Sequence, residues 1–182
     1  MEYKYAYQMD AGFIADILAI DAAVYEPTAR GTMDSLLDRY NANRESFILA
    51  CQGPRIVGYV AFFPIEKHLT HRILNESIPF DDNIKATDIL PGYPRDVDVD
   101  LLLISIAIFP EFNGMGIGRE LMGRYFGFVG EKIQGGCRIT NTYSYAVTDA
   151  GARVLGKFGF DIIKHVKYQG EDADVKLMHY RH

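Results

Sequence analysis

Cysteines and long hydrophobic runs are both scarce in this sequence, and each shortage excludes a class of protein. The two cysteines, Cys51 and Cys137, lie far apart, and neither belongs to a Cys-x-x-Cys pair. The sequence therefore predicts neither a zinc site nor a disulfide framework. The longest apolar run, residues 101–110, is interrupted only by Ser105 and has about half the length of a membrane-spanning helix. We expect no membrane association.

Basic residues are too few and too scattered for a nucleic-acid-binding protein. Lys and Arg number 19 against 24 Asp and Glu, which gives a formal net charge of −5. A nucleic-acid site needs a concentrated basic surface that replaces counterions, and no stretch of this sequence provides one.

The N-terminal segment lacks a basic start and a small-residue cleavage site. It does not have the pattern of a signal peptide, so we expect a cytoplasmic protein.

Length and composition are those of one soluble globular domain. The 182 residues are 48% hydrophobic and 24% charged, close to the globular average. A chain of this length buries about 70% of the surface that it exposes when unfolded. No repeat period and no low-complexity tract occurs. We therefore predict a single domain over residues 1–182.

Hydrophobic periodicity predicts strands interleaved with helices. The predicted strands cover residues 2–8, 46–51, 55–63, 99–108, 138–142, 161–167 and 174–180. The predicted helices run from Asp10 to Pro27, from Thr32 through Tyr40, and over residues 114–132 and 149–157. This order indicates an α/β or α+β fold with a sheet of six to seven strands. Because interior glycines weaken a helix, we expect Gly123 and Gly127 to allow close packing of a helix on the sheet.

Residues 64–97 show no stable hydrophobic period and form an irregular insertion between two predicted strands. Connections of this length in a compact domain are usually functional or mobile. Acidic residues gather in and directly after the insertion: Glu76, Asp81, Asp82, Asp88, Asp96, Asp98 and Asp100. They are typical of a solvated loop or a dimer contact, or they provide an anionic field that attracts a cationic substrate.

The glycine-rich segment 113–119 joins the apolar strand 99–108 to the helix that follows. Glycine lets the backbone turn without a Cβ in the way, and the first amides of a helix are unpaired and partly positive. Together they can hold a pyrophosphate; a tight turn without a ligand is the alternative. A dinucleotide fingerprint is excluded, because its third glycine would fall on Leu121 or Arg119.

Residues 101–122 resemble the central motif of the Gcn5-related N-acetyltransferases (GNAT), Arg/Gln-x-x-Gly-x-Gly/Ala after the fourth strand. Gly116 and Gly118 match the two small positions, and Asn113 replaces the Arg or Gln. Residues 154–160 are similar to the family's later Leu-Tyr-x-Lys-x-Gly-Phe motif. The resemblance implies a single-domain GNAT fold with a mixed central sheet and helices on both faces. It also implies acetyl-CoA as cosubstrate.

The resemblance further implies where the cosubstrate binds. In the family, backbone groups of the fourth strand hydrogen-bond the thioester oxygen and the pantetheine, and the glycine-rich loop holds the pyrophosphate. The corresponding residues here are Ile106, Ala107, Ile108, Asn113, Gly114, Met115, Gly116, Ile117, Gly118 and Arg119.

Acyl transfer to an amine needs a group that accepts a proton, because an alkyl ammonium with a pKa near 10.4 is almost fully charged at neutral pH. The family often uses a carboxylate near the start of the fourth strand. The matching position is Leu102, so we predict that Asp100 is the base, directly or through water, with a solvent-facing carboxylate as the alternative. The family's proton-donating tyrosine falls on Leu155. Tyr143 or Tyr145 could replace it, or pack in the core; we name Tyr143.

Two histidine pairs, His68-x-x-His71 and His179-x-x-His182, lack further ligands at a consistent spacing. We therefore expect no metal site.

These observations favour an acetyl-CoA-dependent N-acetyltransferase that acts on a primary amine of a small molecule or peptide, and we expect this amine to be cationic. The amine would attack the thioester directly. A non-catalytic acyl-CoA-binding sensor or interaction module is the alternative, because the family tyrosine is missing. A structural domain without CoA binding is the third reading. The acceptor, the acyl length and the oligomeric state, including a homodimer, are left open by the sequence.

Overall fold

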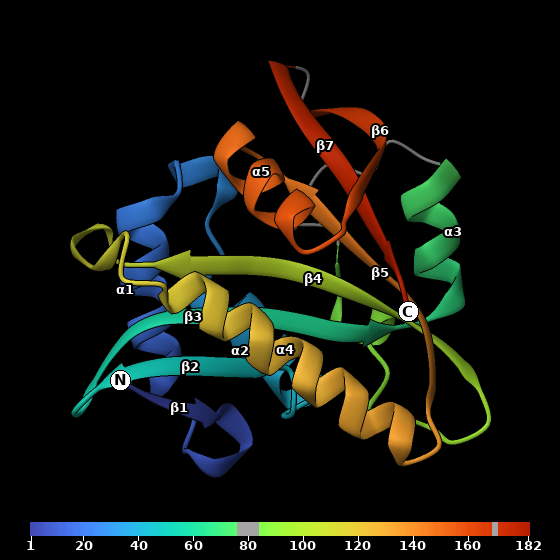
Figure 1. The fold of residues 1–182 in the computed structure, drawn as a ribbon, viewed down its shortest axis with the longest axis horizontal. Helices are drawn as coiled ribbons and strands as arrows, with labels where there is room; N and C mark the ends of the chain where they lie inside the picture. Colours follow the sequence, from blue (N-terminus) through green and yellow to red (C-terminus); the bar gives the residue numbers. More distant parts are fainter. Residues whose placement is uncertain (76–83, 169–170) are drawn as a thin grey trace.

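The apolar strands of the sequence join into one sheet. The computed structural model describes residues 1–75, 84–168 and 171–182 (Figure 1). The strands are β1 (Glu2–Tyr5), β2 (Phe47–Gln52), β3 (Arg55–Ile65), β4 (Asp98–Ile108), β5 (Arg138–Ala146), β6 (Asp161–Tyr168) and β7 (Glu171–Arg181). Their spatial order is β1-β2-β3-β4-β5-β7-β6. Neighbours pair antiparallel except β4 and β5, which are parallel. The expected mixed sheet is confirmed.

Helices cover both faces of this sheet, as expected. The helices are α1 (Phe13–Val24), α2 (Met33–Ala42), α3 (Lys67–Asn75), α4 (Ile117–Gln134) and α5 (Asp149–Lys157). In Figure 1, α4 crosses the near face and α1 and α2 lie behind the sheet. One core joins Ile14 and Ile17 of α1 to Phe63 of β3, and the other joins Leu121 of α4 to Leu101 of β4. No helix in the described ranges is long and apolar enough to cross a bilayer.

Helix starts follow the local capping chemistry. Thr32 caps α2 by accepting a hydrogen bond from the Ser35 amide at 3.2 Å, and Thr148 caps α5 by accepting from the Gly151 amide at 3.0 Å. Asp10 does not cap α1. Its carboxylate accepts a hydrogen bond from the Gly12 amide at 2.8 Å, within the turn that precedes the helix.

The expectation that Gly123 and Gly127 allow close packing is wrong. Both glycines lie on the exposed side of α4, and a Cβ added at either position would meet no atom within 4 Å. The close approach occurs at Gly118 instead, where an added Cβ would lie 3.3 Å from Ile108 Cδ1.

The segment predicted to be irregular is shorter than 64–97. Strand β3 continues through Pro64 to Ile65, and α3 follows at once with Leu69 and Ile73 buried. A 3-10 turn, η3, covers Ala86–Asp88. Residues 76–83, which include Asp81 and Asp82, lie outside the described residues.

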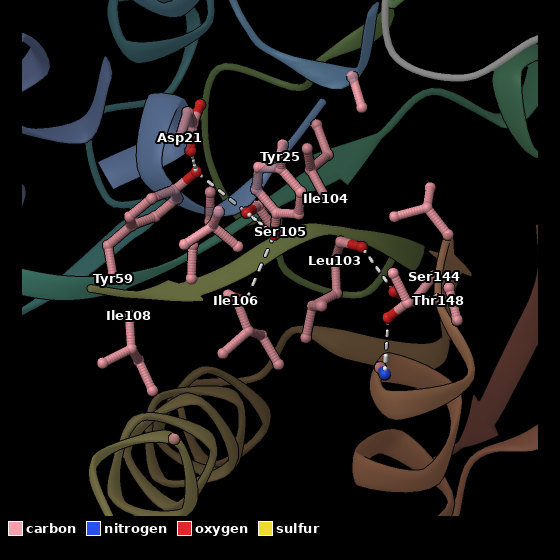
Figure 2. A pocket seen from close by; sticks show the side chains of 18 of the residues that line it. Asp21, Tyr25, Tyr59, Leu103, Ile104, Ser105, Ile106, Ile108, Ser144 and Thr148 are labelled. Carbon is pink, nitrogen blue, oxygen red and sulfur yellow. Dashed lines mark hydrogen bonds between the residues drawn. The ribbon is translucent and has the colours of Figure 1, made fainter. Parts of the chain in front are cut away.

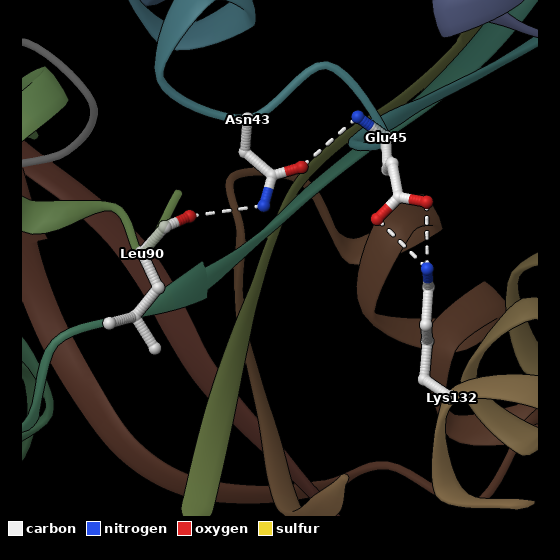
Figure 3. A network of polar contacts seen from close by, with 4 residues as sticks. All are labelled: Asn43, Glu45, Leu90 and Lys132. Atoms are coloured by element: carbon white, nitrogen blue, oxygen red, sulfur yellow. Dashed lines mark hydrogen bonds and ion pairs between the residues drawn. The ribbon is translucent and has the colours of Figure 1, made fainter. Parts of the chain in front are cut away.

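Two groups anchor the end of this segment. Asp88 is buried; it accepts a hydrogen bond from the Lys85 amide at 2.8 Å and contacts His68 Nε2 at 2.7 Å. Figure 3 shows the second anchor, buried Asn43, which donates to the Leu90 carbonyl at 3.0 Å and accepts from the Glu45 amide. The Glu45 carboxylate in turn holds Lys132 of α4 at 2.7 Å. These contacts attach residues 85–90 to α3 and to the end of α2.

Candidate active site

A cavity of about 470 Å³ opens where β4 and β5 separate. The two strands run in parallel register until Leu103 pairs with Ser144, and this pair ends their ladder. β4 continues to Ile108, and residues 103–108 line the cavity together with the end of β5. The start of α5 and the end of α1 close it (Figure 2). The edge of β4 beyond Leu103 therefore faces the cavity with backbone groups that β5 does not use.

The structure brings several of the predicted cosubstrate residues to this cavity. Ile106, Ala107 and Ile108 line it from β4, and Asn113 and Gly118 line it from the following loop and α4. The other predicted residues, Gly114, Met115, Gly116, Ile117 and Arg119, continue the same loop and the first turn of α4.

The glycine-rich loop has the backbone shape expected of an anion cradle. Gly114 and Gly116 have φ angles of 81° and 78°, a conformation that glycine adopts without a steric cost. A Cβ added at either would meet no atom within 4 Å, so the space in front of the loop is open. The Glu120 amide makes the first bond of α4, to the Gly116 carbonyl. The amides of residues 117–119 precede this bond, and such amides attract phosphate. The loop fits a pyrophosphate group.

A chain of hydroxyl groups lies on the α1 side of β4. The Tyr25 and Ser105 hydroxyls are 2.9 Å apart, Ser105 donates to the Tyr59 hydroxyl at 3.0 Å, and Tyr59 donates to the Asp21 carboxylate. Tyr25 also donates to the Ile106 carbonyl at 3.3 Å. All of these residues line the cavity, and Figure 2 shows them next to one another.

A β-bulge in β4 places Ser105 on this side. Ala61 of β3 pairs with Ser105, and Phe62 pairs with Leu103, so Ile104 is an extra residue between them. Leu103 and Ile106 pack toward α4, whereas Ile104 packs toward α1. Ser105 follows Ile104 onto the α1 side, where its hydroxyl reaches Tyr59. Bulges re-aim side chains in this way and are frequent beside active sites.

The sequence analysis did not predict this line of hydroxyl groups. The signal that could have found it is Ser105, the polar interruption of an otherwise apolar strand. Burial, followed by the charge of the neighbouring Asp21, raises the pKa of Tyr59 well above its ordinary value. Tyr59 therefore keeps its proton at neutral pH and donates it in the hydrogen bond to Asp21.

Asp100 lies at the other end of β4 and is not among the residues that line the cavity. Its carboxylate accepts hydrogen bonds from Thr70 Oγ1 at 3.0 Å, Thr140 Oγ1 at 2.9 Å and Asn141 Nδ2 at 2.7 Å. These three donors tie α3 and β5 to β4. That Asp100 acts as the base stays a prediction, which this position does not favour.

The two tyrosines named as candidate acids differ in position. The Tyr143 ring stacks on His179 with 5.2 Å between the ring centroids and does not line the cavity. Burial, and then the nearby Asp100, raises the pKa of Tyr143. Tyr145 does line the cavity, and burial raises its pKa to about 12. Leu155 lines it from α5 at the family's tyrosine position. Tyr145 is therefore the phenol of the two that a bound substrate could meet.

Arg30 holds the end of α1 that carries Tyr25. Its Nε donates to the Tyr25 carbonyl at 2.7 Å, and its second guanidinium nitrogen donates to the Ala22 carbonyl at 3.1 Å.

Part of the cavity wall is apolar, with Leu36, Phe47 and Phe63 among its lining residues. Two buried charged residues, Asp21 and Arg39, also line it.

Three histidines have a side-chain hydrogen-bond partner. His68 contacts Asp88, His179 contacts Asn141, and His182 contacts Thr142. Burial lowers the pKa of His182 to about 4. Within residues 1–75, 84–168 and 171–182, no group of three or more His, Cys, Asp or Glu side chains could hold a metal ion.

Comparison with known sequences and folds identifies the family of this chain and the structures that share its fold. The sequence model described as the acetyltransferase (GNAT) family matches residues 14–160. No curated protein matches the chain significantly in sequence.

Solved structures match nearly the whole chain. Ard1 from Thermoplasma volcanium has 16% identity and a TM-score of 0.66, over 99% of this chain and 96% of the other. Arabidopsis thaliana Naa50, in complex with the bisubstrate analogue CoA-Ac-MVNAL, has 11% identity and a TM-score of 0.65, over 98% and 97%. The GphF GNAT-like decarboxylase, in complex with isobutyryl-CoA, has 14% identity and a TM-score of 0.70, over 100% and 99%. At these identities the likeness establishes the fold.

Proposed function

The chain belongs to the acetyltransferase (GNAT) family, and from this premise we propose that it transfers an acetyl group from acetyl-CoA to a primary amine. One observation carries the proposal. A single cavity contains the open edge of β4, residues of the loop and first turn that lead into α4, and a chain of polar side chains at the end of α1. Donor and acceptor could therefore meet within it.

Two groups of residues in this protein would bind the cosubstrate. Amides 117–119 and the loop glycines would hold the pyrophosphate, and the β4 edge at Ile106, Ala107 and Ile108 would hydrogen-bond the pantetheine. Acetyl-CoA would supply an acyl group activated as a thioester. Unpaired amides on the β4 edge would stabilise the negative charge that develops on the acyl oxygen during transfer.

The acceptor would enter from the end of α1, where Tyr25, Ala29 and Gly31 line the cavity. The expectation of a cationic amine remains part of the proposal. Asp88 does not support it, because this carboxylate is buried against His68 and the Lys85 amide. Inside the cavity, one buried acidic residue, Asp21, lies with one buried basic residue, Arg39. A peptide amine is one acceptor class to test, since the analogue bound to Naa50 carries a peptide.

The experiment combines binding with turnover. Calorimetry with acetyl-CoA tests the cradle, and thiol detection with a panel of polyamines, small monoamines and peptides tests transfer. We expect binding without an amine and release of free CoA thiol with at least one amine class. Binding without thiol release for any amine would leave the second candidate, a non-catalytic acyl-CoA-binding module. Leu155, which cannot donate a proton, favours that candidate. Absence of binding would reject both.

A further inference from the structure

The proposed reaction requires a proton acceptor, and the cavity contains a line of hydroxyl groups that ends on a buried carboxylate. We propose that the chain Tyr25–Ser105–Tyr59–Asp21 is the proton path of acyl transfer and that Asp21 is its final proton acceptor. This inference rests on the proposed function and identifies the catalytic base within the same site.

The hydrogen bonds that Ser105 and Tyr59 donate both point toward Asp21. Tyr59 donates to the carboxylate, and Ser105 donates to Tyr59 at 3.0 Å. Since each hydroxyl carries one proton, the Ser105 oxygen is left to accept. Its neighbour on the open side is the Tyr25 hydroxyl at 2.9 Å, whose one proton can point to Ser105 or to the Ile106 carbonyl at 3.3 Å. Asp21 is 4% exposed, whereas Tyr25 and Ser105 are only partly buried. A proton can therefore enter at the accessible end and leave an ionised carboxylate neutral at the buried end.

The position of the entrance matches the reaction. Ser105 follows the bulge at Ile104, directly beyond the last pair between β4 and β5, and Tyr25 contacts the carbonyl of Ile106 on the same strand. The Tyr25–Ser105 end of the proton path thus lies beside the edge of β4 that we assign to the pantetheine and its thioester. A general base acts through direct contact or a short relay, and this relay starts where the two substrates would meet.

The proton balance of the step is complete. The acceptor arrives as an ammonium ion; one N–H bond breaks, and this proton goes to Ser105 Oγ, directly or through Tyr25. Ser105 passes its own proton to Tyr59, which passes its proton to the Asp21 carboxylate. The neutral nitrogen forms a C–N bond to the acyl carbon while the C–S bond breaks. The second N–H proton of the acceptor goes to the departing sulfur, and Asp21 later returns its proton to solvent through the same chain.

Charged and titratable groups from each surrounding element face this cavity. They are Asp21 and Tyr25 from α1 and its end, Arg39 from α2, Tyr59 from β3 and Tyr145 from β5. Tyr59 and Tyr145 stay protonated at neutral pH, because burial raises the pKa of both. An ionised carboxylate in such a place needs hydrogen bonds, and Tyr59 supplies one to Asp21.

The test separates catalysis from structure by means of pH profiles. Three variants interrupt the path: Asp21→Asn, Tyr59→Phe and Ser105→Ala. Tyr125→Phe is the matched control, because it also removes a buried phenol hydrogen bond, to Thr142 at 2.6 Å, but Tyr125 lies on α4 and does not line the cavity. For each protein, kcat/KM for an amine substrate is measured from pH 6.5 to 10, and acetyl-CoA affinity is measured by calorimetry.

The expected result is a loss of about 10²-fold or more in kcat/KM at pH 7 for each path variant. The loss shrinks toward pH 10, where the free amine is already neutral, and acetyl-CoA affinity does not change. Tyr125→Phe keeps the wild-type profile shape. If Asp21→Asn does not fold, Ser105→Ala and Tyr59→Phe decide the question, since each removes only one hydroxyl.

Two results would overturn the inference while the proposed function stands. One is a wild-type pH profile in Ser105→Ala and Tyr59→Phe, and the other is a uniform loss at every pH, which indicates a structural role. If the wild-type protein releases no thiol with any amine, the proposed function itself fails.

Discussion

Single residues decide this site through their backbone positions as much as through their chemistry. Ser105 faces Tyr59 because Ile104 is an extra residue in β4, so strict strand alternation would have placed its hydroxyl on the opposite face. Gly116 carries no side chain, yet its φ of 78° turns the chain into α4 and leaves the space in front of the loop open.

At this scale we predict that Gly116→Val weakens acetyl-CoA binding by at least tenfold. A β-branched side chain would occupy the open space of the cradle. Because valine would also have to adopt the left-handed backbone conformation of Gly116, the substitution would cost about 1–3 kcal/mol of folding stability. Calorimetry on both proteins measures the affinity, and urea unfolding measures the stability. Gly92→Val is the control for valine at an open glycine, because an added Cβ there also meets no atom within 4 Å. Equal affinities for Gly116→Val and wild type would remove the cradle from the proposed site.

A second prediction at this scale concerns His182, whose pKa burial lowers to about 4. Because the folded pKa lies below the unfolded value near 6.5, the unfolded state binds more protons between these values. This contribution to stability is therefore complete above pH 6.5 and decreases as the pH falls toward 4. Urea midpoints at pH 7.5, 6 and 5 should fall less for His182→Gln than for wild type. Parallel pH dependences for the two proteins would contradict the assignment.

At the scale of elements, periodicity predicted nearly every strand and helix, because each apolar stripe faces one of the two cores. Helix α3 escaped prediction because only Leu69 and Ile73 are buried on it, and prolines and charges surround it. The glycine loop could be located because its conformation is local. The path from Tyr25 to Asp21 could not, since Tyr25 and Ser105 are 80 residues apart and meet only through the bulge and the packing of α1 on the sheet.

Helix α4 provides a prediction about stability. Gly123 and Gly127 lie on its exposed side with open space where a Cβ would stand. Gly→Ala at an exposed position inside a helix gains about 1 kcal/mol, so each substitution should raise the free energy of unfolding by roughly that amount. Urea denaturation checks this. A decrease in stability would mean that these glycines have packing partners after all.

The connection between α1 and α2 provides a prediction about activity. Arg30→Ala removes hydrogen bonds to the carbonyls of Tyr25 and Ala22. These bonds hold Tyr25, the accessible end of the proposed proton path, in position. Two hydrogen bonds at about 1 kcal/mol each correspond to a loss of up to roughly 30-fold in kcat/KM for the amine. Acetyl-CoA affinity should not change. Arg124→Ala is the control, since Arg124 is exposed on α4 and lies over the Tyr3 ring, away from the cavity. An equal loss in both variants would contradict a specific role for Arg30.

At the scale of the whole molecule, the sheet is divided into two parts that share only part of one ladder. β1 to β4 form one antiparallel run, β5 to β7 form another, and β4 meets β5 only up to Leu103 and Ser144. The cavity lies where this ladder stops, with α1 and α5 on either side of it. A ligand that hydrogen-bonds the free edge of β4 would therefore connect the two parts as an added strand does.

This arrangement predicts that acetyl-CoA stabilises the protein as a whole and protects one strand in particular. A ligand at 100 times its Kd adds roughly 2.7 kcal/mol to the free energy of unfolding, which raises Tm by roughly 5–10 °C for a domain of this size. Amide hydrogen exchange in residues 104–108 should slow upon binding, because these groups would exchange solvent for pantetheine. Gly116→Val should show a smaller shift in Tm at the same ligand concentration. Protection on α4 without any change in β4 would place the ligand outside the gap between the strands and would contradict the site proposed here.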